Sequence, residues 1–93
     1  MRTIRRTSRF KRDWKREMAG RHRAVLEKEF VAIVSLLVSD TPLPPRQFDH
    51  PLTGEWKDHR DCHVRPDLVL IYRKPDAEHL DLVRLGSHSE LGL

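Results

Sequence analysis

The sequence predicts an α+β fold, in which a short N-terminal strand and a two-helix hairpin pack on an antiparallel sheet. Two observations support this prediction. Apolar residues recur at helical spacing between residues 8 and 38, and segments with the length and composition of strands follow residue 53. The connections between these segments are short, so neighbouring strands are expected to be antiparallel. A chain of 93 residues is expected to form one domain, residues 1–93.

The first helix is expected to begin at the threonine–serine pair 7–8, because either hydroxyl can accept a backbone N–H bond at a helix start. Phe10, Trp14 and Met18 then recur every four residues, which places them on one side of the helix. Gly20 is expected to end the helix as a C′ glycine.

The second helix is expected from about His22 to Val38. It ends before Pro42, because proline cannot continue a helix. Residues 39–53 hold four prolines and are expected to form an extended loop. The helix has one apolar face, formed by Leu26, Phe30, Ile33, Val34 and Leu37.

Three strands are predicted in the second half of the chain. The first spans roughly residues 54–64, with a possible break near Asp58, and the second spans 67–73, whose apolar run is typical of a buried central strand. The third spans 78–85. Alternation along it predicts two faces, one with Leu80 and Leu82 and the other with Val83 and Leu85.

Positive charge is concentrated in the first third of the chain. Residues 1–28 carry 11 Lys/Arg and 3 Asp/Glu, whereas residues 29–93 carry 7 and 11. Such an asymmetry suits a polyanionic partner, because each neutralised phosphate releases counterions. A solvated helix face is the other interpretation, and the residues alone leave both open.

The composition also indicates a compartment. The single cysteine, Cys62, excludes an intramolecular disulfide and fits a reducing environment. No apolar run approaches the length of a membrane span, and the charged N-terminus lacks the apolar segment of a secretory signal. We therefore expect a cytoplasmic protein that does not bind membranes.

Groups that can transfer protons gather between residues 49 and 72, which hold three of the six histidines and five of the fourteen acidic residues. If the strand 54–64 is extended, His59, Asp61 and His63 share one face and Cys62 lies on the other. The residues expected to converge from neighbouring strands are His50, His63, Asp67, Arg84 and His88.

This set of residues fits the cleavage of RNA. RNA carries its own nucleophile, the 2′-hydroxyl, so a ribonuclease needs a base, an acid and a cation that stabilises the charged transition state. Imidazoles titrate near neutral pH and can act as both base and acid, and a guanidinium can balance the phosphate charge. The alternative for each residue is structural: a lone histidine is usually an ordinary surface or core residue, and Asp67 could simply cap a turn.

A zinc site is the main competing interpretation. His59, Cys62 and His63 offer suitable ligand types, with His50 or His88 as a fourth. However, strand alternation directs Cys62 away from the two histidines, and the chain contains no paired CxxC motif. A metal is therefore not expected.

The second half of the chain closely resembles the YafQ branch of the RelE superfamily of bacterial toxins. The matching residues are Leu43, Pro44, Asp49, His50, Pro51, Leu52, Gly54, Trp56, Lys57, Arg60, Asp61, His63, Val64, Pro66, Asp67, Leu70, Ile71, Tyr72, Arg84, Gly86 and His88. The first half is similar in architecture more than in residues.

The resemblance implies a RelE-like microbial ribonuclease fold and the toxin of a type II toxin–antitoxin system. It implies an mRNA interferase, an endoribonuclease that cuts message in the ribosomal A site without a metal or another cofactor. The implied partners are mRNA, the ribosome with its rRNA, and a cognate antitoxin that forms a hetero-oligomer with the toxin.

The resemblance also implies functional residues. His50 and His63 would share proton transfer with the assistance of Asp67, while His88 would orient the substrate or protonate the leaving group. The residues expected to bind substrate phosphate are Arg84, Arg60 and Lys57.

One position departs from the family pattern. An aromatic residue is expected four positions after the last histidine, and this chain has Gly92 there. This departure motivates a second hypothesis, in which the protein is a catalytically weak RNA- or ribosome-binding module of the same fold.

Overall fold

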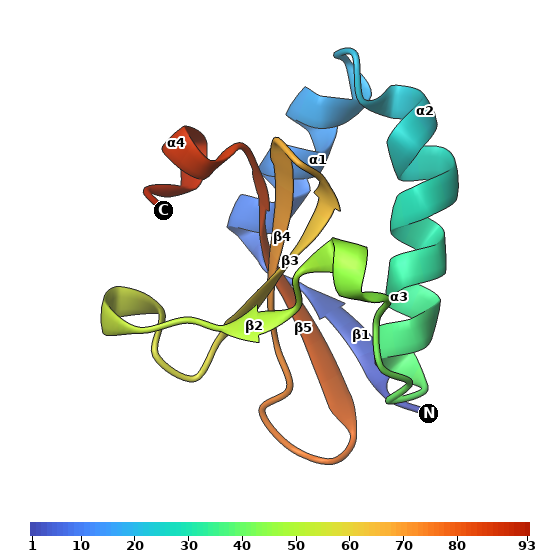
Figure 1. Cartoon of the computed structure of the whole chain (residues 1–93), viewed down its shortest axis with the longest axis vertical. Helices are drawn as coiled ribbons and strands as arrows, with labels where there is room; N and C mark the ends of the chain where they lie inside the picture. The colour runs from blue at the N-terminus through green and yellow to red at the C-terminus, as the bar shows by residue number, and fades with distance from the viewer.

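A computed structural model describes residues 1–93 and confirms the α+β fold (Figure 1). Its five-stranded sheet has the order β1-β5-β4-β3-β2. The pairs from β2 to β5 are antiparallel, but β1 is parallel to β5, so the sheet is mixed. The strands are β1 (Thr3–Arg6), β2 (His50–Pro51), β3 (Arg60–Arg65), β4 (Leu68–Arg73) and β5 (His79–Gly86).

The mixed sheet follows from the long segment of chain between β1 and its neighbour β5. Parallel neighbours need a long crossover, and everything between Arg6 and His79 serves as that connection for β1 and β5. The sequence-based expectation of a purely antiparallel sheet rested on short connections, which exist only in the second half of the chain.

The first helix, α1 (Ser8–Met18), begins and ends where the sequence predicts. The Thr7 hydroxyl caps it by accepting the Phe10 N–H at 3.0 Å. Ala19 at the C-terminal end is right-handed, and Gly20 is not left-handed either, so this helix ends without the expected glycine cap.

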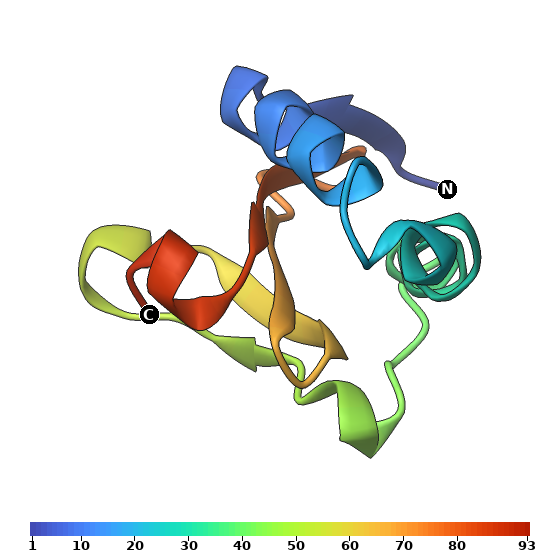
Figure 2. The same cartoon turned by 90° about the horizontal axis from the view of Figure 1, so that it is seen from above.

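The second helix contains α2 (Arg23–Val25), a π-helical segment (Leu26–Phe30) and α3 (Val31–Val38). In the π segment each backbone hydrogen bond spans one residue more than in an α-helix, and nothing in the apolar spacing indicated it. All five residues of the predicted apolar face are nevertheless buried. Figure 2 shows this helix nearly end-on, whereas α1 lies across the view.

The main core lies between the helices and one face of the sheet. Phe30 contacts both α1 aromatics, with ring centroids 6.1 Å from Phe10 and 5.0 Å from Trp14. The buried members of this core are Phe10, Leu26, Phe30, Ile33, Val34, Leu37, Cys62, Val64, Leu68, Leu70, Tyr72, Leu80, Leu82 and Leu85.

The opposite face of the sheet is only partly covered. A short helix, α4 (His88–Leu91), buries Leu91 against Val69 and Ile71. Leu52 and Trp56, from the loop between β2 and β3, pack against the same cluster. This face therefore keeps room for polar side chains that neighbouring strands bring together.

The predicted strand 54–64 is wrong in its first half. Residues Gly54–Trp56 form a 3₁₀ helix, and Asp58 adopts a left-handed φ of 70°, which confirms the break expected there. The strand starts only at Arg60, so His59 does not belong to it.

The predicted faces of the last strand are wrong beyond Leu82, because β5 contains a β-bulge. Ile71 pairs with Arg84 and Tyr72 pairs with Leu82, so Val83 has no partner of its own. The extra residue shifts the alternation. Leu85 therefore joins Leu80 and Leu82 in the main core, while Val83 packs on the opposite face.

The helices of this structure are too short or too polar to cross a lipid bilayer.

Candidate active site

A row of paired residues crosses four strands on the partly covered face. His50 of β2 lies opposite Asp61 of β3, Asp61 lies opposite Ile71 of β4, and Ile71 lies opposite Arg84 of β5. Directly paired residues share a face, so His50, Asp61 and Arg84 are presented together. With strands about 4.8 Å apart, the row spans about 14 Å from His50 to Arg84.

Asp61 lies at the centre of three histidines. Its side chain is only 4% exposed, and its Oδ1 lies 3.0 Å from His50 Nδ1 without hydrogen-bond geometry. Burial raises the pKa of the Asp61 carboxyl, while positive charge on His50, His63 and His88 acts in the opposite direction. A buried carboxylate with an unsatisfied oxygen is unusual and is a feature of functional sites.

The loop backbone determines the tautomer of neutral His50. Its Nδ1 lies 2.7 Å from the carbonyl oxygen of Phe48, and a carbonyl can only accept a hydrogen bond. Nδ1 therefore carries the proton, and Nε2 keeps a free lone pair. Since the side chain is 51% exposed, Nε2 is available to exchange protons with a substrate.

His63 and His88 form the second half of the cluster, with ring centroids 5.0 Å apart in an edge-to-face arrangement. Burial lowers the pKa of His63, and His88 and His50 lower it further, while Asp61 opposes them. A histidine with a lowered pKa is largely neutral at physiological pH and so can accept a proton.

His88 is the first residue of α4 and is held by the caps of that helix. Ser87 and Glu90 form a capping box, in which the Ser87 hydroxyl accepts the Glu90 N–H at 3.1 Å and Glu90 accepts the Ser87 N–H at 2.8 Å. Gly92 ends the helix with a left-handed φ of 72°. An aromatic side chain at this position would be strained in this backbone conformation, so the departure at Gly92 has a local structural role.

Arg60 holds the loop that carries His50. Its Nε donates to Asp49 Oδ1 at 3.1 Å, and the Tyr72 hydroxyl donates to the same oxygen at 2.5 Å. Burial and the bond to Asp49 raise the pKa of Tyr72. Arg60, expected to bind phosphate, is thus engaged with the residue next to His50 and positions it.

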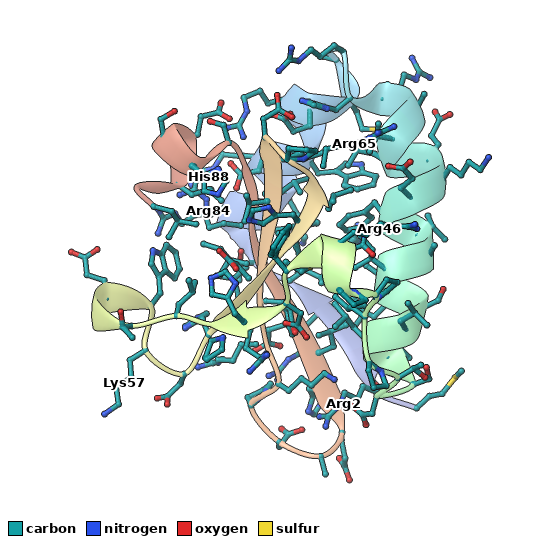
Figure 3. The ribbon with its side chains drawn as sticks, in the orientation of Figure 1. Arg2, Arg46, Lys57, Arg65, Arg84 and His88 are labelled. Atoms are coloured by element: carbon teal, nitrogen blue, oxygen red, sulfur yellow. The ribbon has the colours of Figure 1, made fainter.

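Arg84 is anchored by α1. Its Nε and Nη2 donate to the two oxygens of Asp13 at 2.7 and 3.2 Å, and the Leu85 N–H donates to Asp13 at 3.0 Å. Burial alone would raise the pKa of Asp13, but these hydrogen bonds and the charges of Arg84 and Arg16 lower it. Arg84 Nη1 makes no hydrogen bond and remains available. Figure 3 shows Arg84 and His88 on the side of the sheet that α4 covers.

Two expected residues lie apart from the cluster. Asp67 occupies the turn between β3 and β4, where its half-exposed carboxylate pairs with Arg21. Lys57 is exposed at the outer end of the loop after β2 (Figure 3). The structure therefore places His50, His63, His88 and Arg84 on one side of the sheet, with Arg84 at the far end of the row from His50, whereas Asp67 and Lys57 lie apart from them.

The ligands of the competing zinc interpretation are separated. Cys62 is fully buried in the main core, on the face opposite His63, and burial raises the pKa of its thiol. His59 packs against Trp56 outside the strand, with ring centroids 5.4 Å apart.

Sequence reasoning missed two residues of this site. Strand alternation placed Asp61 beside His63, but it could not show that Asp61 is buried among three histidines. Phe48 lies against His63 with ring centroids 5.4 Å apart. An apolar side chain in a polar, proline-rich loop was the only available indication of its role.

The fold and the site define a small α+β protein with an acid–base cluster of histidines beside an anchored arginine. The family described as "Bacterial toxin of type II toxin-antitoxin system, YafQ" matches residues 2–92. The chain belongs to this YafQ family of toxins.

Relatives and solved structures agree with this assignment. The mRNA interferase toxin YafQ of Escherichia coli K12 is 47% identical over 60 residues, which cover 63% of this chain and 64% of that protein. The chain in the E. coli DinJ–YafQ complex superposes with a TM-score of 0.83 at 34% identity, over 98% of each chain. A metal-bound toxin from Helicobacter pylori has a TM-score of 0.84 at 41% identity, over 98% of this chain and 99% of that one.

Proposed function

We propose that this protein is an mRNA interferase, an endoribonuclease that cleaves message by acid–base catalysis with the RNA 2′-hydroxyl as nucleophile. The observation that carries the proposal is the cluster of three histidines around buried Asp61, with Arg84 in the same row of the sheet. The E. coli relative is named an mRNA interferase. Residues 1–93 act as one toxin domain in the cytoplasm.

The histidines divide the proton transfers. Neutral His63 takes the proton of the 2′-hydroxyl as the O2′–P bond forms, consistent with its lowered pKa. As the P–O5′ bond breaks, protonated His50 gives its proton to the departing 5′-oxygen. Asp61, 3.0 Å from His50, stabilises that imidazolium. The products are a 2′,3′-cyclic phosphate and a 5′-hydroxyl, and each proton transfer contributes about 10²–10⁴-fold to the rate.

The remaining residues of the expected set have supporting roles. His88 contacts His63 and orients the ring or the substrate. Arg84 directs its free Nη1 to the phosphate as negative charge develops. Asp67, at the tip of the β3–β4 hairpin, assists from the rim of the site, and Arg60 and Lys57 add positive charge along the path of the RNA.

The partners follow from charge and family. The basic N-terminal third, with exposed Arg9, Lys11 and Arg12 on α1, suits the phosphates of the ribosome. We propose that cleavage occurs on message in the A site. A cognate antitoxin forms a hetero-oligomer with this chain, as DinJ does with YafQ in the solved E. coli complex.

Alanine substitution of the histidines tests the nuclease. His50→Ala and His63→Ala should each lower cleavage at least 100-fold and abolish growth arrest, because each removes one proton transfer. His22→Ala is the control and should leave cleavage unchanged, since that side chain lies at the start of α2 and makes no capping hydrogen bond. Primer extension on translated message measures cutting. Normal cleavage by His63→Ala would refute its role.

A second candidate function is a catalytically weak module that binds RNA or the ribosome. Gly92, in place of an aromatic residue at the end of α4, is the observation that favours it. The same primer extension separates the two candidates. Discrete cuts after induction support the nuclease, whereas stalled but intact message supports the binding module.

A further inference from the structure

Phe48 is an exposed aromatic residue in an uncommon backbone conformation. Phe48 is 63% exposed to solvent, whereas the other five aromatic residues are buried or half-buried. Its φ of 48° and ψ of 47° lie in the left-handed region, which is uncommon for a residue other than glycine. Strained positions of this kind persist where the surroundings fix them, and they cluster at functional sites.

Two hydrogen bonds hold the Phe48 backbone. Its N–H donates to the Pro45 carbonyl at 3.1 Å, and its own carbonyl accepts from His50 Nδ1 at 2.7 Å. The residue that fixes the His50 tautomer therefore also presents an aromatic ring to solvent. Because the backbone is held from both sides, the ring is a pre-positioned surface rather than a free loop side chain.

The Phe48 ring lies next to the two neighbouring rings of His63 and His88. Its centroid lies 5.4 Å from that of His63, which in turn lies 5.0 Å from that of His88. His63, the proposed base, therefore lies between His88 and the exposed aromatic face of Phe48. A nucleotide whose phosphate lies at His63 has its base within reach of that face.

A cleft of about 770 Å³ opens beside Phe48, between the second helix and the end of β3. Ile33 and Leu36 form its apolar wall, and Arg46 and Gln47 line its loop side. Arg46 is exposed and makes no hydrogen bond or ion pair, so it is free to meet a phosphate. Figure 3 shows Arg46 between the sheet and the second helix. The volume lies in the range of about 300–1,000 Å³ typical of small-ligand sites.

We propose that Phe48 is a stacking platform for a nucleobase of single-stranded RNA next to the cleaved phosphate, with Arg46 binding the phosphate of the flanking nucleotide. The proposal rests on the proposed nuclease function and adds the subsite that positions its substrate. Stacking on an aromatic ring accepts any base and therefore adds affinity without strict sequence selection.

Binding of a 2′-O-methyl RNA oligonucleotide tests the platform without catalysis, since this RNA lacks the nucleophilic hydroxyl. Phe48→Ala and Phe48→Leu should both raise its Kd about tenfold, and Phe48→Trp should keep the wild-type value, because only an aromatic face stacks. Val31→Ala is the control, as it removes another exposed apolar side chain that does not line this cleft and instead lines a separate pocket with Met1 and Ile4. Thermal unfolding checks that all four variants fold.

The outcomes separate this inference from the nuclease itself. With unmodified message, Phe48→Ala should raise KM more than it lowers kcat. If the wild type cuts RNA but Phe48→Ala and Phe48→Leu bind the oligonucleotide as the wild type does, the platform is wrong and the nuclease stands. If the oligonucleotide binds through Phe48 but no RNA is cut, the nuclease fails and the platform stands. Failure of the wild-type protein to bind the oligonucleotide, or retained affinity in Phe48→Leu alone, also overturns the platform.

Discussion

Asp61 shows at the residue scale how this site differs from an ordinary core. Its carboxylate is almost fully buried, and one oxygen has no hydrogen bond. Burial of an ionised group without full compensation destabilises a fold. The raised pKa of Asp61 indicates that the charges of the three histidines do not fully offset this cost. A residue that lowers stability at neutral pH fits a role in chemistry better than a role in folding.

Asp61→Asn should therefore stabilise the protein and impair it as an enzyme. The folded-state pKa is raised, so the destabilisation is absent below the unfolded value of 3.8 and develops as pH rises above it. We expect a gain of about 1 kcal/mol at pH 7 that disappears near pH 4, measured by urea unfolding. Cleavage should fall at least tenfold, because His63 loses the nearby negative charge that stabilises its imidazolium form.

The pH dependence of cleavage provides a second readout of the same substitution. Asp61 raises the pKa of His63, so its loss lowers that pKa further, and the acid limb of kcat/KM should move to lower pH. A variant that is destabilised at pH 7, or whose acid limb moves to higher pH, would contradict this account of Asp61.

Whether the position of a site residue could be predicted depended on the interaction that determines that position. His50 and His63 lie on the same face of the sheet because strand pairing fixes both positions, and their roles in catalysis stay a prediction. Asp67 was expected in the same cluster, but its place is decided by a turn and by Arg21, which lies 46 residues away in the sequence. Local patterns contain no information about such a long-range partner.

Irregular elements limit sequence-based prediction at the next scale. The helices and the central strand β4 followed from apolar spacing, because burial of one face imposes that spacing. The bulge at Val83 cannot be recognised in the sequence, since a valine fits the apolar pattern of either face of the sheet. The bulge nevertheless places Arg84 opposite Ile71, in the same row as Asp61 and His50.

The contact between α1 and β5 is an element-scale feature with a measurable energy. Asp13 accepts from Arg84, Arg16 and the Leu85 N–H, and its side chain is only 5% exposed. Asp13→Ala should lower the free energy of unfolding by about 3 kcal/mol, because it leaves the mostly buried Arg84 guanidinium and the Leu85 N–H without their partner. Urea unfolding at pH 7 measures this loss.

The pH dependence of that contact has the opposite sign to that of Asp61. The pKa of Asp13 is lowered in the folded state, so its stabilisation is present above the unfolded value of 3.8 and is lost as pH falls through the folded value. Asp40→Ala is the matched control, because Asp40 pairs with Arg2 and Lys74 at an exposed site and should matter much less. Equal losses for the two variants would show that the Asp13 contact is not special.

At the scale of the whole molecule, the two halves of the chain divide the work. The second half forms most of the sheet and contains all three histidines of the cluster. The first half adds β1, the helices that cover the main core, and most of the positive charge. Asp13 links the halves, since it extends from the basic helix α1 to the arginine of the site. Helix α1 thus carries exposed positive charge and also anchors Arg84 of the candidate site.

If the protein binds the ribosome as proposed, this division of charge predicts how that binding depends on salt. Lys11 and Arg12 are exposed on α1 and make no ion pair, so replacing both by glutamine should weaken binding without unfolding the protein. Each lost phosphate contact should reduce the slope of log affinity against log salt by about 0.7–0.9. A control that replaces Arg23 and Lys28 on the second helix changes the net charge equally. If the two variants bind alike over a salt series, net charge rather than α1 attracts the ribosome, and the basic face loses its assigned role.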